Sequence, residues 1–261
     1  MPELPEVETV IRSLVPHIRG RTIVRAELSS RRVTRGDWAA TEAALTDATI
    51  TGVRRRGKQI FIDLNRGILY VHLGMTGKLL WNADPGKYTR ARLELDSGTL
   101  LFDDIRQFGR FEYLPEEPGA KKGPDALGVD FATFHSRIQR YRGSIKAVFL
   151  NQAFVSGVGN IYADEILFAA RVHPKTAVAR ISKRRAEIIH KHMLGVLEQA
   201  IELRGSSISD YVDSAGLAGE FQTVHRVYAR TGQPCTVCGT PIRRIVIGQR
   251  GTHYCPRCQR A

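Results

Sequence analysis

The sequence predicts an α+β protein on the strength of three observations. Apolar residues Val7, Val10 and Leu14 recur on one face of an amphipathic helix that leads the chain. Short β-type runs follow between about residues 22 and 113, and helical periodicity takes over beyond residue 128. All four cysteines lie near the end of the chain. The predicted order is therefore a leading helix, an antiparallel sheet region, a helical region and a small cysteine-bearing module.

The β-type region contains seven short segments that alternate in polarity or are rich in β-branched residues. Turn residues separate some of them, as at Asn65-Arg66-Gly67 and Asp96-Ser97-Gly98. This pattern predicts an antiparallel sandwich or barrel. The expected strands are residues 22–28, 49–53, 59–64, 68–73, 78–81, 91–95 and 100–103.

A Pro- and Gly-containing stretch, residues 115–128, is the best candidate for a linker. Beyond it, Ser182 can cap a helix that runs to Arg204, and Gly205 can end it. The residues expected to form the buried stripe of this helix are Ile188, Ile189, Leu194, Leu197 and Ile201. The predicted domains are residues 1–118, 129–226 and 227–261.

The charge balance indicates an anionic partner. The chain of 261 residues has 39 Lys and Arg against 26 Asp and Glu, a net charge of +13. Such a surplus is typical of proteins that bind a phosphate backbone, although ribosomal, membrane-surface and thermophilic proteins share it. No apolar run approaches the ~18 residues that span a membrane, and the acidic N-terminus is unlike a signal peptide. We expect a cytoplasmic monomer that does not bind membranes.

The cysteines form two close pairs, Cys235-x-x-Cys238 and Cys255-x-x-Cys258, with sixteen residues between the pairs. This spacing is typical of a tetrahedral Zn²⁺ site. Two disulfides or a redox motif are the alternatives, and a cytoplasmic location disfavours disulfides. Four thiolates leave no position for water, so we expect one structural Zn²⁺. Between the pairs, residues 242–247 are β-rich and residues 249–251 are expected at a hairpin tip, which would present Arg250.

The chain start offers a nucleophile. Removal of Met1 would leave Pro2 with a free secondary amine, and an α-amino group titrates near pH ~7.7–8.0. Attack of this amine on a sugar carbon would give an iminium ion, which is an electron sink for later elimination. The alternative is an ordinary helix start, because Pro5 suits a first turn and the carboxylates of Glu3 and Glu6 complement the helix dipole.

The opening string Met-Pro-Glu-Leu-Pro-Glu-Val-Glu-Thr resembles the start of the formamidopyrimidine-DNA glycosylases, which are bacterial base-excision repair enzymes. Further strings agree with this resemblance, and together they span essentially the whole chain. It implies an N-terminal β-sandwich with its leading helix, a helix-two-turn-helix domain and a zinc-finger hairpin. The further matching strings are residues 54–58, 72–77, 104–109, 155–165 and the cysteine module.

The resemblance also implies catalytic roles. Pro2 would attack C1′ of a damaged nucleotide, and Glu3 would protonate the sugar ring oxygen. Glu6, one turn along the helix, would position the helix start or tune the amine. Lys58 would assist proton transfer, and Lys58 and Arg250 would steady the phosphates during β- and δ-elimination.

Several DNA contacts follow from the same resemblance. Met75, Arg106 and Phe108 would fill the space left by an extruded nucleotide. Asn160, which follows a Gly-x-Gly string before a helix, would meet a phosphate. Tyr88 stands where many members of the family have a DNA-contacting histidine. The full set of expected DNA-binding residues is His72, Met75, Tyr88, Arg106, Phe108, Arg142, Lys146 and Asn160.

The expected substrate is duplex DNA that contains oxidised purines, 8-oxoguanine and formamidopyrimidines, or abasic sites. The fourth residue supports this branch, because related endonuclease VIII enzymes usually have Gly where this chain has Leu4. Residues 209–222 resemble the mobile loop that closes over a purine lesion in the family. One alternative is an endonuclease VIII-like glycosylase for oxidised pyrimidines, and another is a damage-sensing DNA-binding protein without catalysis.

Overall fold

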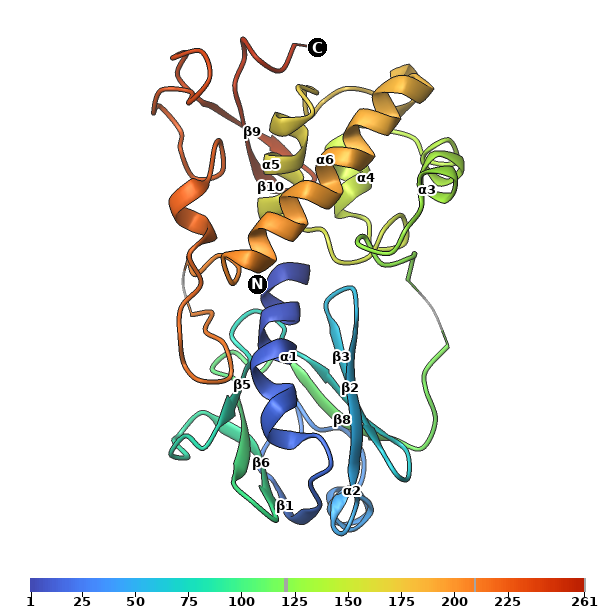
Figure 1. The fold of residues 1–261 in the computed structure, drawn as a ribbon, viewed down its shortest axis with the longest axis vertical. Coiled ribbons are helices and arrows are strands. Elements are labelled where there is room, and N and C mark those ends of the chain that lie inside the picture. The colour runs from blue at the N-terminus through green and yellow to red at the C-terminus, as the bar shows by residue number, and fades with distance from the viewer. Residues whose placement is uncertain (120–121, 209, 261) are drawn as a thin grey trace. The chain divides into compact units, whose positions relative to one another are not determined.

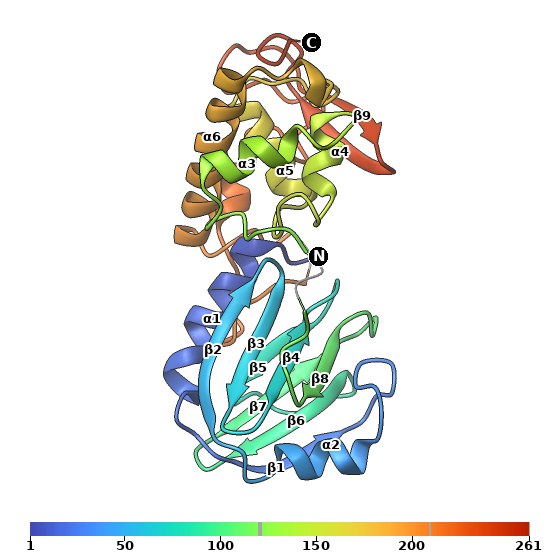
Figure 2. The same ribbon diagram turned by 90° about the vertical axis from the view of Figure 1, so that its right-hand side faces the viewer.

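The computed structural model describes residues 1–119, 122–208 and 210–260 (Figures 1 and 2). The chain divides into two compact units. The first unit comprises residues 1–119 together with residues 203–220, and the second comprises residues 120–202 and 221–261. The first unit is therefore built from two stretches that are far apart in the sequence.

The first unit contains two four-stranded antiparallel sheets, in the strand orders β1-β6-β7-β5 and β2-β3-β4-β8. Helix α1 (Leu4–Ile18) packs on β2 and β3 of one sheet and on β5 of the other. Both sheets and α1 contribute to one apolar core, in which Leu14, Val71 and Phe102 are completely buried. The strands are β1 Ile23–Leu28, β2 Ile50–Arg56, β3 Gln59–Leu64, β4 Ile68–His72, β5 Lys78–Trp81, β6 Thr89–Leu95, β7 Thr99–Asp103 and β8 Arg110–Leu114.

The seven expected strands are confirmed, with shifts of up to three residues at their ends. Two elements of this unit lay outside the prediction, β8 and the short helix α2 (Trp38–Leu45). In α2, the side chain of Asp37 caps the first turn by accepting the N–H of Ala39 at 3.0 Å. Only Leu45 of this alanine-rich helix is buried, so the sequence carries no apolar stripe that would have indicated a helix.

The second unit is mainly helical and is built around α5 (Asn160–Ala169). Residues 161–168 of this helix are all buried, because α4 (Ile145–Leu150), α6 (Lys183–Glu202) and β10 (Arg250–Tyr254) pack against it. Helix α5 is therefore the element against which the rest of this unit is positioned. The remaining elements are α3 Phe131–Ile138, the 3₁₀ turns Val178–Arg180 and Phe221–Val224, and strand β9 Arg243–Ile247.

Helix α6 confirms the expected long helix, and Ser182 Oγ accepts the N–H of Arg185 at 3.3 Å as its cap. The expected buried stripe was partly wrong, because Ile188 is 39% exposed and Leu194 only half-buried. The buried face of the helix instead includes alanine, histidine and methionine side chains, which a search for large aliphatic residues does not find. The buried residues are Ala186, Ile189, His190, Met193, Leu197, Ala200 and Ile201.

The C-terminal hairpin pairs β9 with β10. Its turn is Gly248-Gln249, with φ of +54° and +61°, the two positive values that a type I′ turn requires. The expected tip at residues 249–251 is corrected by one residue, since Arg250 already pairs with Ile247 as the first residue of β10. Among the described residues, no helix has the length and apolar character needed to cross a membrane.

Candidate functional site

The start of α1 is held by a reciprocal pair of carboxylates. The N–H of Glu3 donates to Oε2 of Glu6 at 2.7 Å, and the Glu3 carboxylate accepts the backbone N–H of Glu6. Pro2, Glu3 and Glu6 are all buried, whereas Met1 is 50% exposed. The N–H of Glu3 belongs to the planar peptide that joins it to Pro2. Glu6 therefore fixes the orientation of the peptide that carries Pro2.

The second carboxylate oxygen of Glu6 binds the returning segment of the first unit, residues 203–220. Ser206 N–H donates to Glu6 Oε1 at 2.7 Å. Gly205, at φ +78°, allows this approach, because a Cβ at this position would lie 2.7 Å from Glu6 Oε1. Glu6 thus accepts one backbone N–H on each oxygen, which is the geometry of a positioning group.

Tyr211 strengthens the same junction. Its hydroxyl donates to the backbone oxygen of Glu6 at 3.2 Å. Burial, together with the nearby Glu6 carboxylate, raises the pKa of Tyr211 above its usual range. The phenol therefore stays protonated and remains a donor at neutral pH.

The stretch expected to be a mobile loop, residues 209–222, begins at a residue outside the described part of the chain. Ser214 Oγ lies 2.8 Å from Ser13 Oγ of α1, and the backbone oxygen of Ser214 accepts the N–H of Trp81 at 2.8 Å. By contrast, residues 215–218 are exposed. The stretch therefore has a base anchored to α1 and an exposed tip.

Lys58 lies in the two-residue loop between β2 and β3, after Gly57 at φ +59°. The lysine is 5% exposed. Arg55 fastens this hairpin to α1, since its Nε donates to Glu8 Oε2 at 2.8 Å and its Nη1 donates to the backbone oxygen of Gly57 at 3.1 Å. Burial raises the pKa of Glu8, but the hydrogen bonds from Arg55 and Arg12 outweigh it and lower this pKa overall.

Met75, Arg106 and Phe108, the three residues expected to fill the space left by an extruded nucleotide, come together from two loops. Arg106 Nη1 lies 3.1 Å from Met75 Sδ, and its guanidinium carbon lies 4.7 Å from the centre of the Phe108 ring. Met75 is 37% exposed and Phe108 is 54% exposed. Two large, partly exposed apolar side chains and one arginine thus form a single cluster, which we call the wedge cluster.

The wedge cluster rests on Asp104, which is completely buried. Asp104 accepts the Thr76 hydroxyl at 2.6 Å and the N–H of Gly109 at 2.8 Å. Thr76 Oγ1 in turn accepts the N–H of Arg106 at 3.0 Å. This network connects the two loops, and sequence reasoning missed it because neither polar residue belongs to a periodic pattern.

Tyr88 and His72 lie beside the same loops. The N–H of Asp104 donates to the backbone oxygen of Tyr88 at 2.9 Å, and Lys87 Nζ lies 4.9 Å above the Tyr88 ring. The half-buried His72 accepts the N–H of Gly74 on Nδ1 at 3.1 Å. Tyr88 therefore presents a partly exposed phenol next to a cation, whereas His72 braces the loop that carries Met75.

In the second unit, Asn160 is the first residue of α5 and Gly159 is its N-cap. Asn160 Nδ2 donates to the backbone oxygen of Gly251 at 3.0 Å, while its buried Oδ1 has no hydrogen-bond partner among the described residues. Arg142 is exposed, and its Nη1 donates to the backbone oxygen of Gln139 at 3.2 Å. Asn160 thus stands at the N-terminus of α5, where the helix dipole favours an anion, and Arg142 is an exposed cation.

Lys146 behaves differently from the other predicted DNA contacts. Its side chain is completely buried and is paired with Asp164 of α5. This burial argues against a direct contact with a phosphate and in favour of a structural role. The other oxygen of Asp164 accepts the backbone N–H of His253 at 2.9 Å and lies 3.1 Å from its ring Nδ1. The sequence did not predict the contact between Asp164 and His253, because the two residues are 89 positions apart and belong to no common motif.

Helix α5 is therefore joined to β10 at two levels, through Asn160 and Gly251 and through Asp164 and His253. Arg250 precedes these contacts as the exposed first residue of β10. The pose of Arg250 thus depends on α5 as well as on the hairpin turn.

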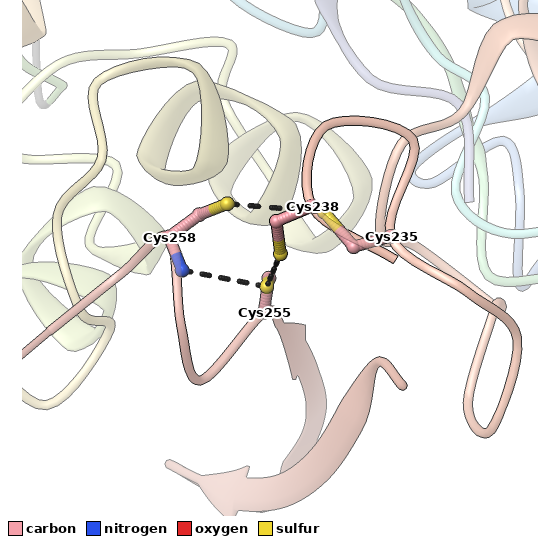
Figure 3. Close-up of side chains that lie close together, drawn as sticks. All are labelled: Cys235, Cys238, Cys255 and Cys258. Carbon is pink, nitrogen blue, oxygen red and sulfur yellow. Dashed lines mark hydrogen bonds between the residues drawn. The ribbon is translucent and has the colours of Figure 1, made fainter. Parts of the chain in front are cut away.

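The four cysteine sulfurs all lie within 4.8 Å of one another (Figure 3). The Cys238–Cys255 sulfur distance is 3.5 Å and the Cys235–Cys258 distance is 3.9 Å. A tetrahedral Zn²⁺ with Zn–S bonds of ~2.3 Å requires sulfur separations of about 3.8 Å. Burial raises the pKa of Cys258, and a bound Zn²⁺ would hold its sulfur and the other three as thiolates. The residues fit one structural Zn²⁺.

Comparison with known proteins identifies the family. The formamidopyrimidine-DNA glycosylase of Solibacter usitatus is 50% identical to the chain over 264 residues, with 100% of both chains covered. The chain belongs to the formamidopyrimidine-DNA glycosylase family. Three family models match the chain. Residues 1–111 match the formamidopyrimidine-DNA glycosylase N-terminal domain, and residues 122–212 match its H2TH domain. Residues 232–261 match the zinc finger found in FPG and IleRS.

Solved structures of the family agree with this assignment. The chain is similar to a Lactococcus lactis Fpg mutant in complex with Fapy-dG containing DNA, with a TM-score of 0.92, 33% identity and 100% of both chains covered. A complex of the Lactococcus lactis Fpg with abasic-site DNA gives the same TM-score and identity and covers 99% of this chain and 100% of that chain. The predicted family, the α+β fold and the four-cysteine zinc finger are thereby confirmed.

Proposed function

We propose that the protein removes oxidised purines, 8-oxoguanine and formamidopyrimidines, from duplex DNA and then cleaves the strand as an AP lyase. The observation that carries this proposal is the buried helix start, where one oxygen of Glu6 accepts the N–H of Glu3, next to Pro2, and the other accepts the N–H of Ser206. Membership of the glycosylase family supports it over the whole length of the chain.

In the proposed reaction, loss of Met1 frees the secondary amine of Pro2. The amine nitrogen attacks C1′ of the damaged nucleotide, the bond from C1′ to the base breaks, and the base leaves with its electron pair. Glu3 donates a proton to the sugar ring oxygen, and the ring opens to a Pro2 iminium ion. Both residues are buried, which keeps water away from this intermediate.

Strand cleavage then proceeds by elimination. A base removes the C2′ proton, and the electron pair of that C–H bond moves toward the iminium nitrogen to give an enamine. Return of this pair expels the 3′ phosphate with its C–O electrons, and a second elimination in the same way breaks the 5′ carbon–oxygen bond. Lys58 and Arg250 supply positive charge for the departing phosphates in this proposal, and Lys58 assists the proton transfers. Glu6 acts as a positioning residue, because its two oxygens are already occupied by backbone N–H groups.

Base extrusion is assigned to the wedge cluster. Its exposed apolar side chains, Met75 and Phe108, would replace the stacking lost when a nucleotide flips, and Arg106 would bind the orphaned partner base. Tyr88, Arg142 and Asn160 would contact the DNA backbone. The proposed domains are residues 1–118, 129–226 and 227–261, of which residues 203–220 pack with the first unit. The protein is proposed to act as a monomer in the cytoplasm, at the nucleoid.

The two alternatives predict different outcomes. An endonuclease VIII-like enzyme would prefer oxidised pyrimidines, whereas Leu4 and the named relatives favour the purine branch. A damage sensor without catalysis would not need a small residue after Met1, nor a buried carboxylate and lysine such as Glu3 and Lys58.

The test is borohydride trapping on a duplex that contains 8-oxoguanine opposite cytosine, followed by peptide mass spectrometry. We expect one adduct on residue 2 of a chain that has lost Met1. The matched control is Pro118→Gly, since Pro118 is exposed in a loop of the same unit. A Pro2→Gly variant that cuts abasic DNA at the full rate would contradict the role of Pro2, and tight binding without any adduct would favour the damage sensor.

A further inference from the structure

The second unit carries a basic hollow that the proposed reaction does not use. It has a volume of about 420 Å³, lies beside Cys238 and Cys258, and its lining includes Arg171, Arg185 and Arg257. A neighbouring hollow of about 450 Å³ shares Arg171 and Arg185. The remaining arginines of the two linings are Arg184 and Arg260. We call the two together the knuckle hollow.

The charge of the knuckle hollow is not compensated by its own lining. No Asp or Glu lines either part. In the described ranges, none of its five arginines takes part in an ion pair with a carboxylate. Several like charges around one concave surface raise the local potential and attract an anionic group.

The lining also includes exposed aliphatic side chains. Val237 is 60% exposed between the first two cysteines, and Ile188 of α6 is 39% exposed. Ile188 was expected in the core, and its exposure therefore needs another explanation. A mixed cationic and aliphatic surface suits a ligand that has both carboxylates and an apolar side chain.

The hollow lies at the far ends of the elements that present the DNA-binding residues of this unit. Asn160 begins α5, whereas Ala169 and Ala170 at the other end of this helix line the hollow. At 1.5 Å per residue, the two ends of the helix are about 15 Å apart. Likewise, Arg250 starts β10 at the hairpin turn, and Cys255 follows the opposite end of that strand. The hollow therefore remains accessible when DNA occupies the residues at the near ends.

The lining does not favour single-stranded nucleic acid. Phe, Tyr and Trp, on which single-stranded bases stack, are missing from both linings. We propose that the knuckle hollow docks an acidic segment of a partner protein, with its carboxylates on the arginines and an aliphatic side chain against Val237 or Ile188. The partner would thereby hold the enzyme without competing for its DNA.

The experiment measures fluorescence anisotropy of a labelled peptide of Asp and Glu residues with two central Leu residues, added to the full-length zinc-loaded protein. We expect saturable binding that weakens as salt rises. The Arg171→Glu/Arg185→Glu variant should lose about tenfold or more in affinity, and Val237→Ser should weaken binding of this peptide but not of a peptide with Ser in place of Leu.

Arg180→Glu is the matched control, because Arg180 is exposed in the same unit but lines neither hollow. This control should bind the peptide as the parent does. All variants should keep their zinc and cleave abasic DNA at the parent rate, so the result is independent of the proposed catalysis. The proposal is overturned if the peptide does not bind, or if Arg180→Glu weakens binding as much as the double variant. It is also overturned if undamaged duplex DNA displaces the peptide and the double variant binds that DNA more weakly than the parent.

Discussion

The backbone N–H of Ser206 donates to Glu6 Oε1 at 2.7 Å, although 200 positions separate the two residues in the sequence. The other oxygen of Glu6 accepts the N–H of Glu3, so this one buried carboxylate connects the chain start with the segment that returns from the second unit. The orientation of Pro2 therefore depends on a contact that forms only in the folded chain.

Glu6→Gln tests this connection. Glutamine has one acceptor oxygen, so either Glu3 or Ser206 loses the partner of a buried N–H, which costs about 1–3 kcal/mol. We expect a lower free energy of urea unfolding by that amount and slower borohydride trapping at saturating DNA. Glu187→Gln, at an exposed position of α6, should change neither quantity. Trapping at the parent rate in a destabilised Glu6→Gln protein would limit Glu6 to a role in stability.

Asp164→Ala should be among the most destabilising single substitutions in the second unit. It leaves the ammonium of Lys146 buried without its carboxylate, a change that typically costs about 3–5 kcal/mol. Urea unfolding measures the loss. The double variant Lys146→Met/Asp164→Leu should recover a large part of it, because no buried charge remains. If the double variant is no more stable than Asp164→Ala, the hydrogen bonds to His253 carry the effect instead.

The wedge cluster predicts a difference between substrates. Met75→Ala/Phe108→Ala should lower single-turnover excision of 8-oxoguanine from duplex DNA by about tenfold or more, because extrusion costs a few kcal/mol without an intercalating group. Cleavage at an abasic site should fall less, since no base has to unstack. Val24→Ala, at a 54% exposed position on β1, is the control and should have no effect. Equal losses on both substrates would argue against a role in extrusion.

Acid should destabilise the second unit through His225. Burial, helped by the charges of Arg230 and His253, lowers the pKa of His225 to about 4. In the unfolded chain the pKa of His225 is ~6.5. Between about pH 6.5 and pH 4, His225 therefore binds a proton in the unfolded chain but not in the folded chain. The contribution of neutral His225 to the free energy of unfolding is therefore fully present above about pH 6.5 and is lost as the pH falls to about 4. The loss is at most about 3 kcal/mol.

The measurement is urea unfolding at pH 7 and pH 4.5. His225→Gln should reduce the difference between the two pH values, whereas His17→Gln, at an exposed position of α1, should leave it unchanged. An unchanged difference in the His225→Gln protein would assign the acid sensitivity to other groups.

Local patterns in the sequence were sufficient for much of this structure. The amphipathic face of α1, the strand alternation and the spacing of the cysteines each depend on neighbouring residues, and all three predictions are confirmed. Helix α2 was not predicted, because its helical character depends on alanine residues and the Asp37 cap and it has no apolar stripe.

The supporting polar contacts could not be predicted, because each joins residues far apart in the chain. The pairs Asp104 with Thr76 and Asp164 with His253 combine common residue types without periodicity. For the same reason Lys146 resembled a surface cation, although folding buries it completely. The resemblance indicated which residues belong together, while the structure shows what holds them.

The returning segment also has a consequence for biosynthesis. The first unit is completed only by residues 203–220, so about 100 residues must be translated after residue 119 before this segment, which carries Ser206, is complete. At 5–20 residues per second, this takes roughly 5–20 s. Until this segment has been translated the contact from Ser206 is missing, so the chain start cannot acquire its final geometry before then.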